Sequence, residues 1–232
     1  MNWEFINKCR RLIRTGWLKS IYFNFAMLPF KQAIKMPIIL SRYTYFYSLS
    51  GKIELTAPVR FGMVRMGFLG EDVLVPKSNR SLLQIEGRFL LGDNVRIGCG
   101  VIIRIEPKAE LIFQDNVRIG SSCRIIAYKS ISIGENTGIS WECQIIDSNM
   151  HDISNITTGE LFPMSKNIII GENNWIGTRA SIMKGCVTPD YTIVASSSVC
   201  NKIYDVPPYT MLAGSPAKFI KSGVVRADYV IK

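Results

Sequence analysis

The sequence predicts an all-β solenoid, a domain in which short parallel strands wind into stacked coils. The first observation is a repeat: GDNVRIG at 92–98 recurs as QDNVRIG at 114–120, and related segments follow at 133–139 and 170–177. The second is that an aliphatic residue, often followed by glycine, returns about every six positions. That period fits neither an α-helix nor an alternating strand. It fits coils of three short strands, each turning one aliphatic side chain inward, whose stacking buries a continuous column.

The composition agrees with one large folded domain. The chain has 232 residues, of which 47% are hydrophobic and 20% are charged, so it is too apolar for a disordered protein. The six cysteines lack the spacing of a zinc site or a disulfide framework, and we expect buried thiols in a reducing compartment. The net charge of +10 raises three candidate partners: nucleic acid, an anionic membrane, or an acidic small molecule.

Residues 1–50 are predicted to form a separate basic segment. They hold eight Lys or Arg against Glu4 alone, which accounts for most of the excess charge. A helical wheel over residues 3–19 gathers apolar side chains on one half and most of the basic ones on the other. Two interpretations stay open: a basic amphipathic helix packed on protein, or one lying in a membrane interface. The residues between Pro29 and Pro37 are compatible with a second short helix.

The charge distribution also bears on location and partners. Residues 20–30 are uncharged over only 11 positions, too few to span a membrane, and no cleavage site follows them. We therefore predict a cytoplasmic protein whose residues 1–50 dock at the inner membrane face. The rest of the chain is nearly neutral and carries no recognisable nucleic-acid motif, so no nucleic-acid partner is predicted.

The repeat domain is predicted to span 51–206, with one interruption. Residues 148–166 lack the repeat and contain the sole histidine, His151. Long excursions from a regular scaffold are usually functional. The pattern ends at Pro207, and in the C-terminal part, 207–232, we expect a short helix over 217–221 with proline in its first turn.

Several short motifs accompany the repeat. After His151 come N-x-W-I-G at 173–177, A-S-S-S-V-x-N-K at 195–202, D-V-P-P at 205–208 and A-G-S-P-A-K at 213–218. On these residues the chain resembles the hexapeptide-repeat acyltransferases. It is most similar to the sugar and polysaccharide O-acetyltransferase branch, which includes the maltose and galactoside acetyltransferases. The resemblance covers roughly residues 90–221 and implies a left-handed parallel β-helix.

The resemblance makes His151 the catalytic base. A histidine, with an ordinary pKa of about 6.5, suits removal of a proton from a sugar hydroxyl and its return to the departing thiolate. A base of this kind needs its second ring nitrogen held by an acceptor. Asp147 is the candidate for this acceptor, with Asp152, Glu142 or a backbone carbonyl as alternatives. No Ser or Cys is placed as a nucleophile, which favours direct transfer in a ternary complex.

The resemblance also implies acetyl-CoA as the donor and a homotrimer as the assembly. The positions that match donor-binding residues of the family are Trp175, Thr178, Ala195, Ser196, Asn201, Lys202, Lys218 and Lys221. The three lysines suit phosphate groups. No metal is expected, because the zinc-dependent carbonic anhydrases of this fold need three histidines and this chain has one.

Two further functions are weighed against a sugar O-acetyltransferase. The first is another acetyltransferase, acting on serine or an amino-sugar. Serine acetyltransferases carry a long helical N-terminal domain, which exceeds what residues 1–80 supply. The second is a catalytically silent β-helix that serves as a binding or scaffold protein.

Overall fold

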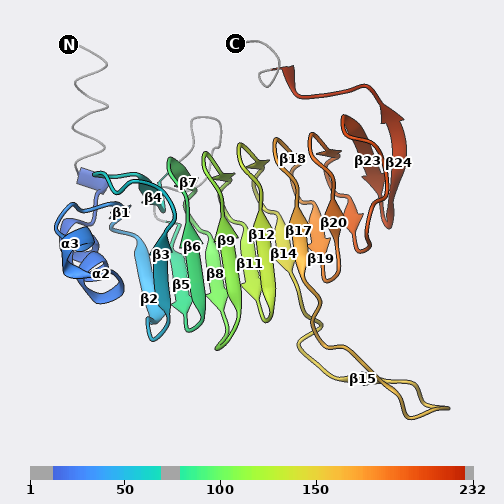
Figure 1. Ribbon diagram of the computed structural model, residues 1–232, viewed down its shortest axis with the longest axis horizontal. Coiled ribbons are helices and arrows are strands. Elements are labelled where there is room, and N and C mark those ends of the chain that lie inside the picture. The colour runs from blue at the N-terminus through green and yellow to red at the C-terminus, as the bar shows by residue number, and fades with distance from the viewer. Residues whose placement is uncertain (1–12, 69–78, 228–232) are drawn as a thin grey trace.

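The computed structural model describes residues 13–68 and 79–227. Its strands form three sheets that make up the long faces of one prism, with coil stacked on coil along its length (Figure 1). Within these faces every strand pair is parallel except the last, β23 with β24. The predicted solenoid of stacked coils is confirmed.

The described elements are as follows. Two helices precede the strands: α2 Trp17–Met27 and α3 Phe30–Ala33. The nine-stranded sheet contains, in spatial order, β1 Ile38–Leu40, β4 Val64–Met66, β7 Val95–Ile97, β10 Arg118–Ile119, β13 Gly138–Ile139, β18 Trp175–Ile176, β21 Ile193–Val194, β23 Thr210–Gly214 and β24 Ala217–Ser222. The seven-stranded sheet contains β2 Thr44–Ser48, β5 Ser81–Ile85, β8 Ile102–Ile105, β11 Arg124–Ala127, β14 Gln144–Ile146, β19 Ser181–Met183 and β22 Val199–Cys200. The six-stranded sheet contains β3 Lys52–Leu55, β6 Arg88–Leu91, β9 Glu110–Phe113, β12 Ser130–Ile133, β17 Ile168–Ile170 and β20 Val187–Thr188. A two-stranded hairpin, β15 Ile153–Ser154 with β16 Leu161–Phe162, stands apart.

Each coil visits the three sheets in the same order and turns at three corners. The first corner leads from the nine- to the seven-stranded sheet, for example at 177–180 and 195–198. The second leads from the seven- to the six-stranded sheet, at 147–167, 184–186 and 201–202. The third leads back to the nine-stranded sheet, for example at 114–117. Because these faces form a prism, the second corner lies opposite the nine-stranded sheet.

The six-residue period corresponds to inward-facing columns. In the seven-stranded sheet Ile103, Ile125, Ile145 and Ile182 lie in register on successive strands, and all four are fully buried. Burying such a side chain contributes about 1.5–3 kcal/mol, so the column is a main source of the domain's stability. Five of the six cysteines are also buried and free, as predicted, while Cys9 lies outside the described residues.

The third corner explains the Asn of the repeat. Asn94, Asn116, Asn136 and Asn173 all adopt positive φ, between 54° and 60°. Asparagine tolerates this left-handed conformation better than most residues. The glycines that follow, such as Gly120, let the next coil approach: a Cβ there would lie 2.5 Å from the backbone carbonyl carbon of Ser140.

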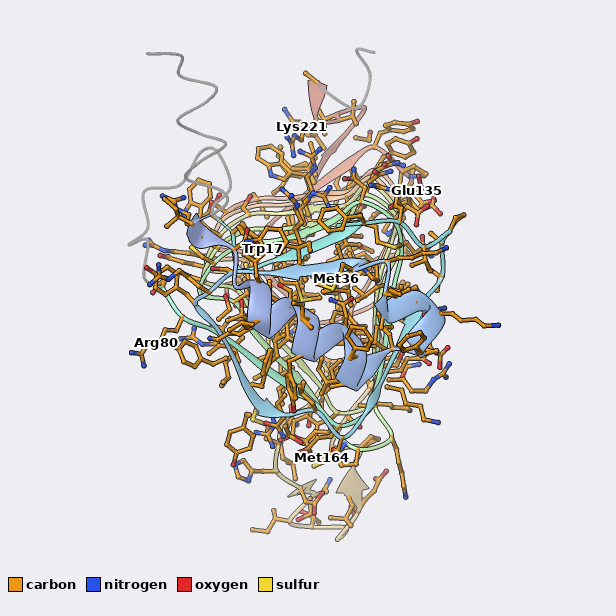
Figure 2. All side chains as sticks on the ribbon, turned by 90° about the vertical axis from the view of Figure 1, so that its left-hand side faces the viewer. Trp17, Met36, Arg80, Glu135, Met164 and Lys221 are labelled. Carbon is orange, nitrogen blue, oxygen red and sulfur yellow. The ribbon has the colours of Figure 1, made fainter. Side chains whose placement is uncertain are left out.

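The N-terminal end of the prism is covered by α2, as Figure 2 shows from that end. Its buried face is held to strand β1 by side chains: Ser20 Oγ accepts a hydrogen bond from Leu40 N, and Asn24 bonds both N and O of Ile38. These bonds satisfy an otherwise open sheet edge. Among the described residues no helix is long and apolar enough to cross a membrane.

The predicted single helix over 3–19 is wrong at its C-terminal end. Residues 1–12 lie outside the described residues, but Thr15 and Gly16 are not helical, and α2 begins at Trp17. Gly16 N donates to Leu40 O, and Thr15 forms a bridge to Ser41, so β-type pairing interrupts the helix. The short helix expected between Pro29 and Pro37 is present as α3. The first two strands, β1 and β2, already lie within residues 1–50.

The predicted C-terminal helix over 217–221 is also wrong. These residues form strand β24, which pairs antiparallel with β23 at the end of the nine-stranded sheet. A helix of five residues is marginal by itself, whereas the open edge of the sheet offers a complete set of backbone partners. These residues therefore pair as a strand and do not form a helix.

Candidate active site

The interruption at 148–166 is an arm that leaves the prism at the second corner (Figure 1). Its neck is closed by backbone pairing: Asn149 N donates to Met164 O, and Ser148 bridges Ser165. The hairpin β15–β16 forms the outer part and exposes apolar side chains, among them Ile156 at 99% exposure. This neck fixes where the first residues of the arm emerge.

His151 lies just beyond this neck. Its side chain is exposed and makes no hydrogen bond or ion pair with any residue that the structure describes. The preceding Met150 has positive φ, and its N–H bonds Ser148 Oγ, which turns the chain at this point. The sole imidazole of the protein is thus held at the base of the arm with both ring nitrogens open to a ligand or a second chain.

Asp147 has a role different from the one predicted. Its side chain is fully buried, and its two oxygens accept hydrogen bonds from the backbone N–H groups of Tyr128, Lys129 and Ser130 at 2.7–2.8 Å. Burial raises the pKa of this carboxyl, and the three N–H donors oppose that shift. None of its described contacts reaches His151. Asp147 fastens the preceding coil at the second corner, from which the arm departs.

The alternative acids are not in contact with His151 either. Glu142 lies at the first corner, where it pairs with Arg179 at 2.6 Å. Asp152 is exposed beside the histidine and bonds none of the described residues. The acceptor that would hold the imidazole is therefore not supplied by the described contacts of a single chain.

The predicted donor-binding residues fall into two separate groups. Trp175 lies on β18, Thr178, Ala195 and Ser196 lie at the first corner, and Lys218 and Lys221 lie on β24. Register links these elements, because Trp175 is aligned with Ile193, then Met211, then Lys221. Asn201 and Lys202 instead lie at the second corner, on the side of the arm.

The second group lines a groove of about 540 Å³ that follows the second corner from the foot of the arm toward the C-terminus. Asn201 and Lys202 are joined there by Lys166 and Lys184, which the sequence reasoning missed. The three lysines are spaced 18 residues apart, one per coil, and this spacing was the signal that could have found them. Lys184 Nζ also donates to Pro163 O in the arm, at 2.8 Å. The groove therefore carries a row of three lysines that begins at Lys166, the last residue of the arm.

The two groups lie on opposite sides of one chain. Figure 1 shows β18 along the upper side and the β15 arm leaving the lower side, and Figure 2 shows Lys221 and Met164 at opposite ends of the view. One chain by itself thus does not bring His151 to Trp175. Three or more His, Cys, Asp or Glu side chains do not gather anywhere in the described ranges in a way that could hold a metal.

Several known proteins similar to this chain are named as acetyltransferases. The putative lipopolysaccharide biosynthesis O-acetyl transferase WbbJ of Escherichia coli (strain K12) is 26% identical over 144 residues, covering 59% of this chain and 72% of that protein. An uncharacterized 24.8 kDa protein in the cps region of Klebsiella pneumoniae is 28% identical over 219 residues, covering 94% of this chain and 92% of its own. No protein-family model matches the chain.

The fold is shared with a solved structure. The crystal structure of the polysialic acid O-acetyltransferase OatWY superposes with a TM-score of 0.56 at 21% identity, over 79% of this chain and 90% of that one. The predicted left-handed β-helix is thereby confirmed. Together these findings agree with the resemblance drawn from the motifs: the chain is similar to O-acetyltransferases, among them two that act on polysialic acid, and it shares their fold.

Proposed function

We propose that this protein transfers an acetyl group from acetyl-CoA to a hydroxyl group of a bacterial surface polysaccharide or its precursor. The observation that carries the proposal is His151, the only imidazole of the sequence, exposed without a described partner at the base of the arm. A groove lined by lysines begins at Lys166, where the same arm ends. One relative is named as a polysialic acid O-acetyltransferase and another as a putative O-acetyl transferase of lipopolysaccharide biosynthesis, which supports a glycan acceptor.

The proposed reaction is a direct transfer. One nitrogen of His151 accepts the hydroxyl proton while the oxygen attacks the thioester carbonyl, and the imidazolium then returns that proton to the CoA thiolate. An acetyl-enzyme is disfavoured because the described cysteines are buried.

We propose that the donor site is completed between subunits of a homotrimer. The arm and the lysine groove lie at the second corner, whereas Trp175, the first corner and β24 lie across the prism. Bringing the second corner of one subunit to the nine-stranded sheet of the next would unite both groups of predicted residues. In that arrangement Lys202 would come from one subunit, and Lys218 and Lys221 from its neighbour, as point charges for the CoA phosphates.

The outer face of α2 supports docking at the inner membrane face. Opposite its bonds to β1, the helix exposes a row of large apolar side chains, with Leu18 at 84%, Tyr22 at 60% and Phe25 at 46% exposure. Phe30 and Ile34, around α3, are exposed as well. Basic residues lie among them: Lys19, Lys31, Lys35 and Arg42. Apolar side chains flanked by cations favour an anionic lipid interface.

This docking predicts that the double substitution Leu18→Glu with Phe25→Glu lowers cosedimentation with vesicles containing anionic lipid. Both side chains are exposed, so the fold should tolerate the change. Ile156→Glu, equally apolar and exposed but on the arm, is the matched control and should bind like the wild type. Equal binding by the double variant would rule out this face as the docking surface.

The enzymatic proposal is tested by thiol release from acetyl-CoA in the presence of an acceptor panel. We expect release with bacterial surface glycans or their lipid-linked precursors, and none above background with serine or amino-sugars. Preference for serine or for an amino group would replace the proposed acceptor class. No binding of acetyl-CoA at millimolar concentration in calorimetry would instead indicate a scaffold protein.

A further inference from the structure

Three consecutive coils place an arginine at the same position of the nine-stranded sheet. The segments are VRMG at 64–67, VRIG at 95–98 and VRIG at 117–120, so the arginine is the central residue of the repeat. Arg65 pairs in register with Arg96, and Arg96 with Arg118. Their strand neighbours are buried while the arginines are not, so the three side chains point outward. We call this set the arginine column.

The described fold does not neutralise the column. None of the three guanidinium groups forms an ion pair with a described carboxylate. Asp93, whose charge acts on Arg96, already forms an ion pair with Arg60 at 2.8 Å. Burial, followed by the positive charges of Arg65 and Arg60, lowers the pKa of Arg96. Arg118 is exposed, and its guanidinium forms no hydrogen bond with any described residue.

Two of the three side chains are nevertheless held in place. Arg96 Nη1 donates to Met63 O at 2.9 Å and to Val95 O at 3.0 Å, and Arg65 lies 5.9 Å from the ring centre of Phe68. Strands in a sheet are about 4.8 Å apart, so the column spans about 10 Å along the prism. Like charges directly opposite on neighbouring strands are destabilising. A bound row of anions would turn this repulsion into attraction.

The column points toward the predicted donor site. The next position in register after Arg118 is Gly138, which has no side chain, and the one after it is Trp175. Trp175 is 38% exposed, and its indole Nε1 donates to Ser140 Oγ. An extended ligand lying along this sheet would therefore pass from the three arginines over Gly138 to Trp175. The resemblance assigns Trp175 to the donor site.

We propose that Arg65, Arg96 and Arg118 bind successive carboxylates of an acidic acceptor glycan that runs along the nine-stranded sheet toward Trp175. Guanidinium groups bind carboxylates in a planar, bidentate way, and three of them in a row match a ligand with repeated charge. The two phosphates of a diphosphate, joined by one oxygen, would occupy fewer of these positions. This inference rests on the proposed function in one respect, because the bound glycan is an acceptor only if the protein transfers acetyl groups. The existence of the binding site does not depend on that function.

The test is equilibrium binding of an acidic polysaccharide with one carboxylate per sugar to the full chain, beside a neutral dextran of equal length. Arg118→Gln is expected to weaken acidic binding about tenfold and to reduce its salt dependence. Arg118→Lys should have an intermediate affinity, because lysine keeps the positive charge but cannot form the bidentate hydrogen bonds of a guanidinium. Arg124→Gln is the matched control: Arg124 is exposed in the same coil, but on the seven-stranded sheet, and should leave binding unchanged.

Other results would overturn the proposal. The first is that dextran binds as tightly as the acidic polysaccharide, and the second is that Arg118→Gln leaves the affinity for that polysaccharide unchanged. The third is that Arg118→Gln abolishes binding of a sugar diphosphate or of anionic vesicles while binding of the acidic polysaccharide is retained. If the double variant Arg65→Gln with Arg118→Gln dissociated an oligomer but bound the glycan with unchanged affinity, the column would be a subunit interface instead. Because binding needs no turnover, a protein that binds the acidic glycan but never transfers acetyl groups would refute the proposed function and leave the column standing.

Discussion

The nine-stranded and six-stranded sheets treat the same residue type in opposite ways. On the six-stranded sheet Arg88 lies in register with Glu110, and its guanidinium bonds Glu110 at 2.7 Å and Glu54 at 3.1 Å. On the nine-stranded sheet Arg96 lies in register with two further arginines. The scaffold is thus able to pair its charges across strands, and on one face it does not. We infer from this difference that the arginine column binds a partner outside the described residues.

The second corner shows the same contrast over four residues. Asp147 is buried, and each of its oxygens is used by backbone N–H groups. His151 is exposed and bonds none of the described residues. We infer that the paired groups hold the fold and that the unpaired groups act on ligands. The predictions below test this division.

Asp147→Asn should have the larger effect on stability. The amide replaces one acceptor oxygen by an NH₂ group, which leaves at least one of the three backbone N–H donors unpaired inside the protein. An unsatisfied buried group costs about 1–3 kcal/mol. Thermal unfolding should therefore show a lower Tm. Asp152→Asn, five residues along and exposed, is the control and should melt like the wild type. Equal melting of both variants would remove the structural role given to Asp147.

Arg88→Gln should have a small effect, because the ion pairs are exposed. The Arg88 hydrogen bond holds the pKa of Glu54 below its ordinary value. A lowered acid pKa stabilises the fold above the unfolded pKa, and this contribution is lost as the pH falls through the folded pKa. The Tm difference from wild type should thus be present at neutral pH and disappear in acid. Arg118→Gln should not lower Tm at either pH. If it lowered Tm at neutral pH as much as Arg88→Gln does, the proposed difference between the two sheets would be wrong.

The regular part of the fold was predictable because each coil repeats the same local rules. Aliphatic residues at inward positions, Asn94 and its equivalents at left-handed corners, and Gly120 at a close contact all leave a sequence signal. The two ends were not predictable in this way. Helix α2 is fixed by the bonds of Ser20 and Asn24 to β1, and β24 by an open sheet edge. Both depend on tertiary partners that no local pattern records.

The site was predictable only in part. The histidine stood out because it is unique and lies in the one break of the repeat. Proximity in sequence suggested Asp147 as its partner, but burial at the corner commits that carboxylate to the backbone. The predicted donor residues lie on two sides of the chain because they follow or belong to strands that end at different corners. Their positions could be predicted only once each strand was assigned to its sheet. The arginine column was visible in the repeat itself, but its meaning depends on register.

Acetyl transfer by His151→Gln, measured under single-turnover conditions with bound acetyl-CoA and an accepted glycan, tests the central claim most directly. The division between paired and unpaired groups predicts an unchanged Tm and unchanged donor affinity, because the side chain bonds no described residue. It also predicts a fall in the transfer rate of about 10²–10⁴-fold, the usual contribution of a general base. A transfer rate within a few-fold of wild type, or a variant that fails through loss of folding, would contradict it.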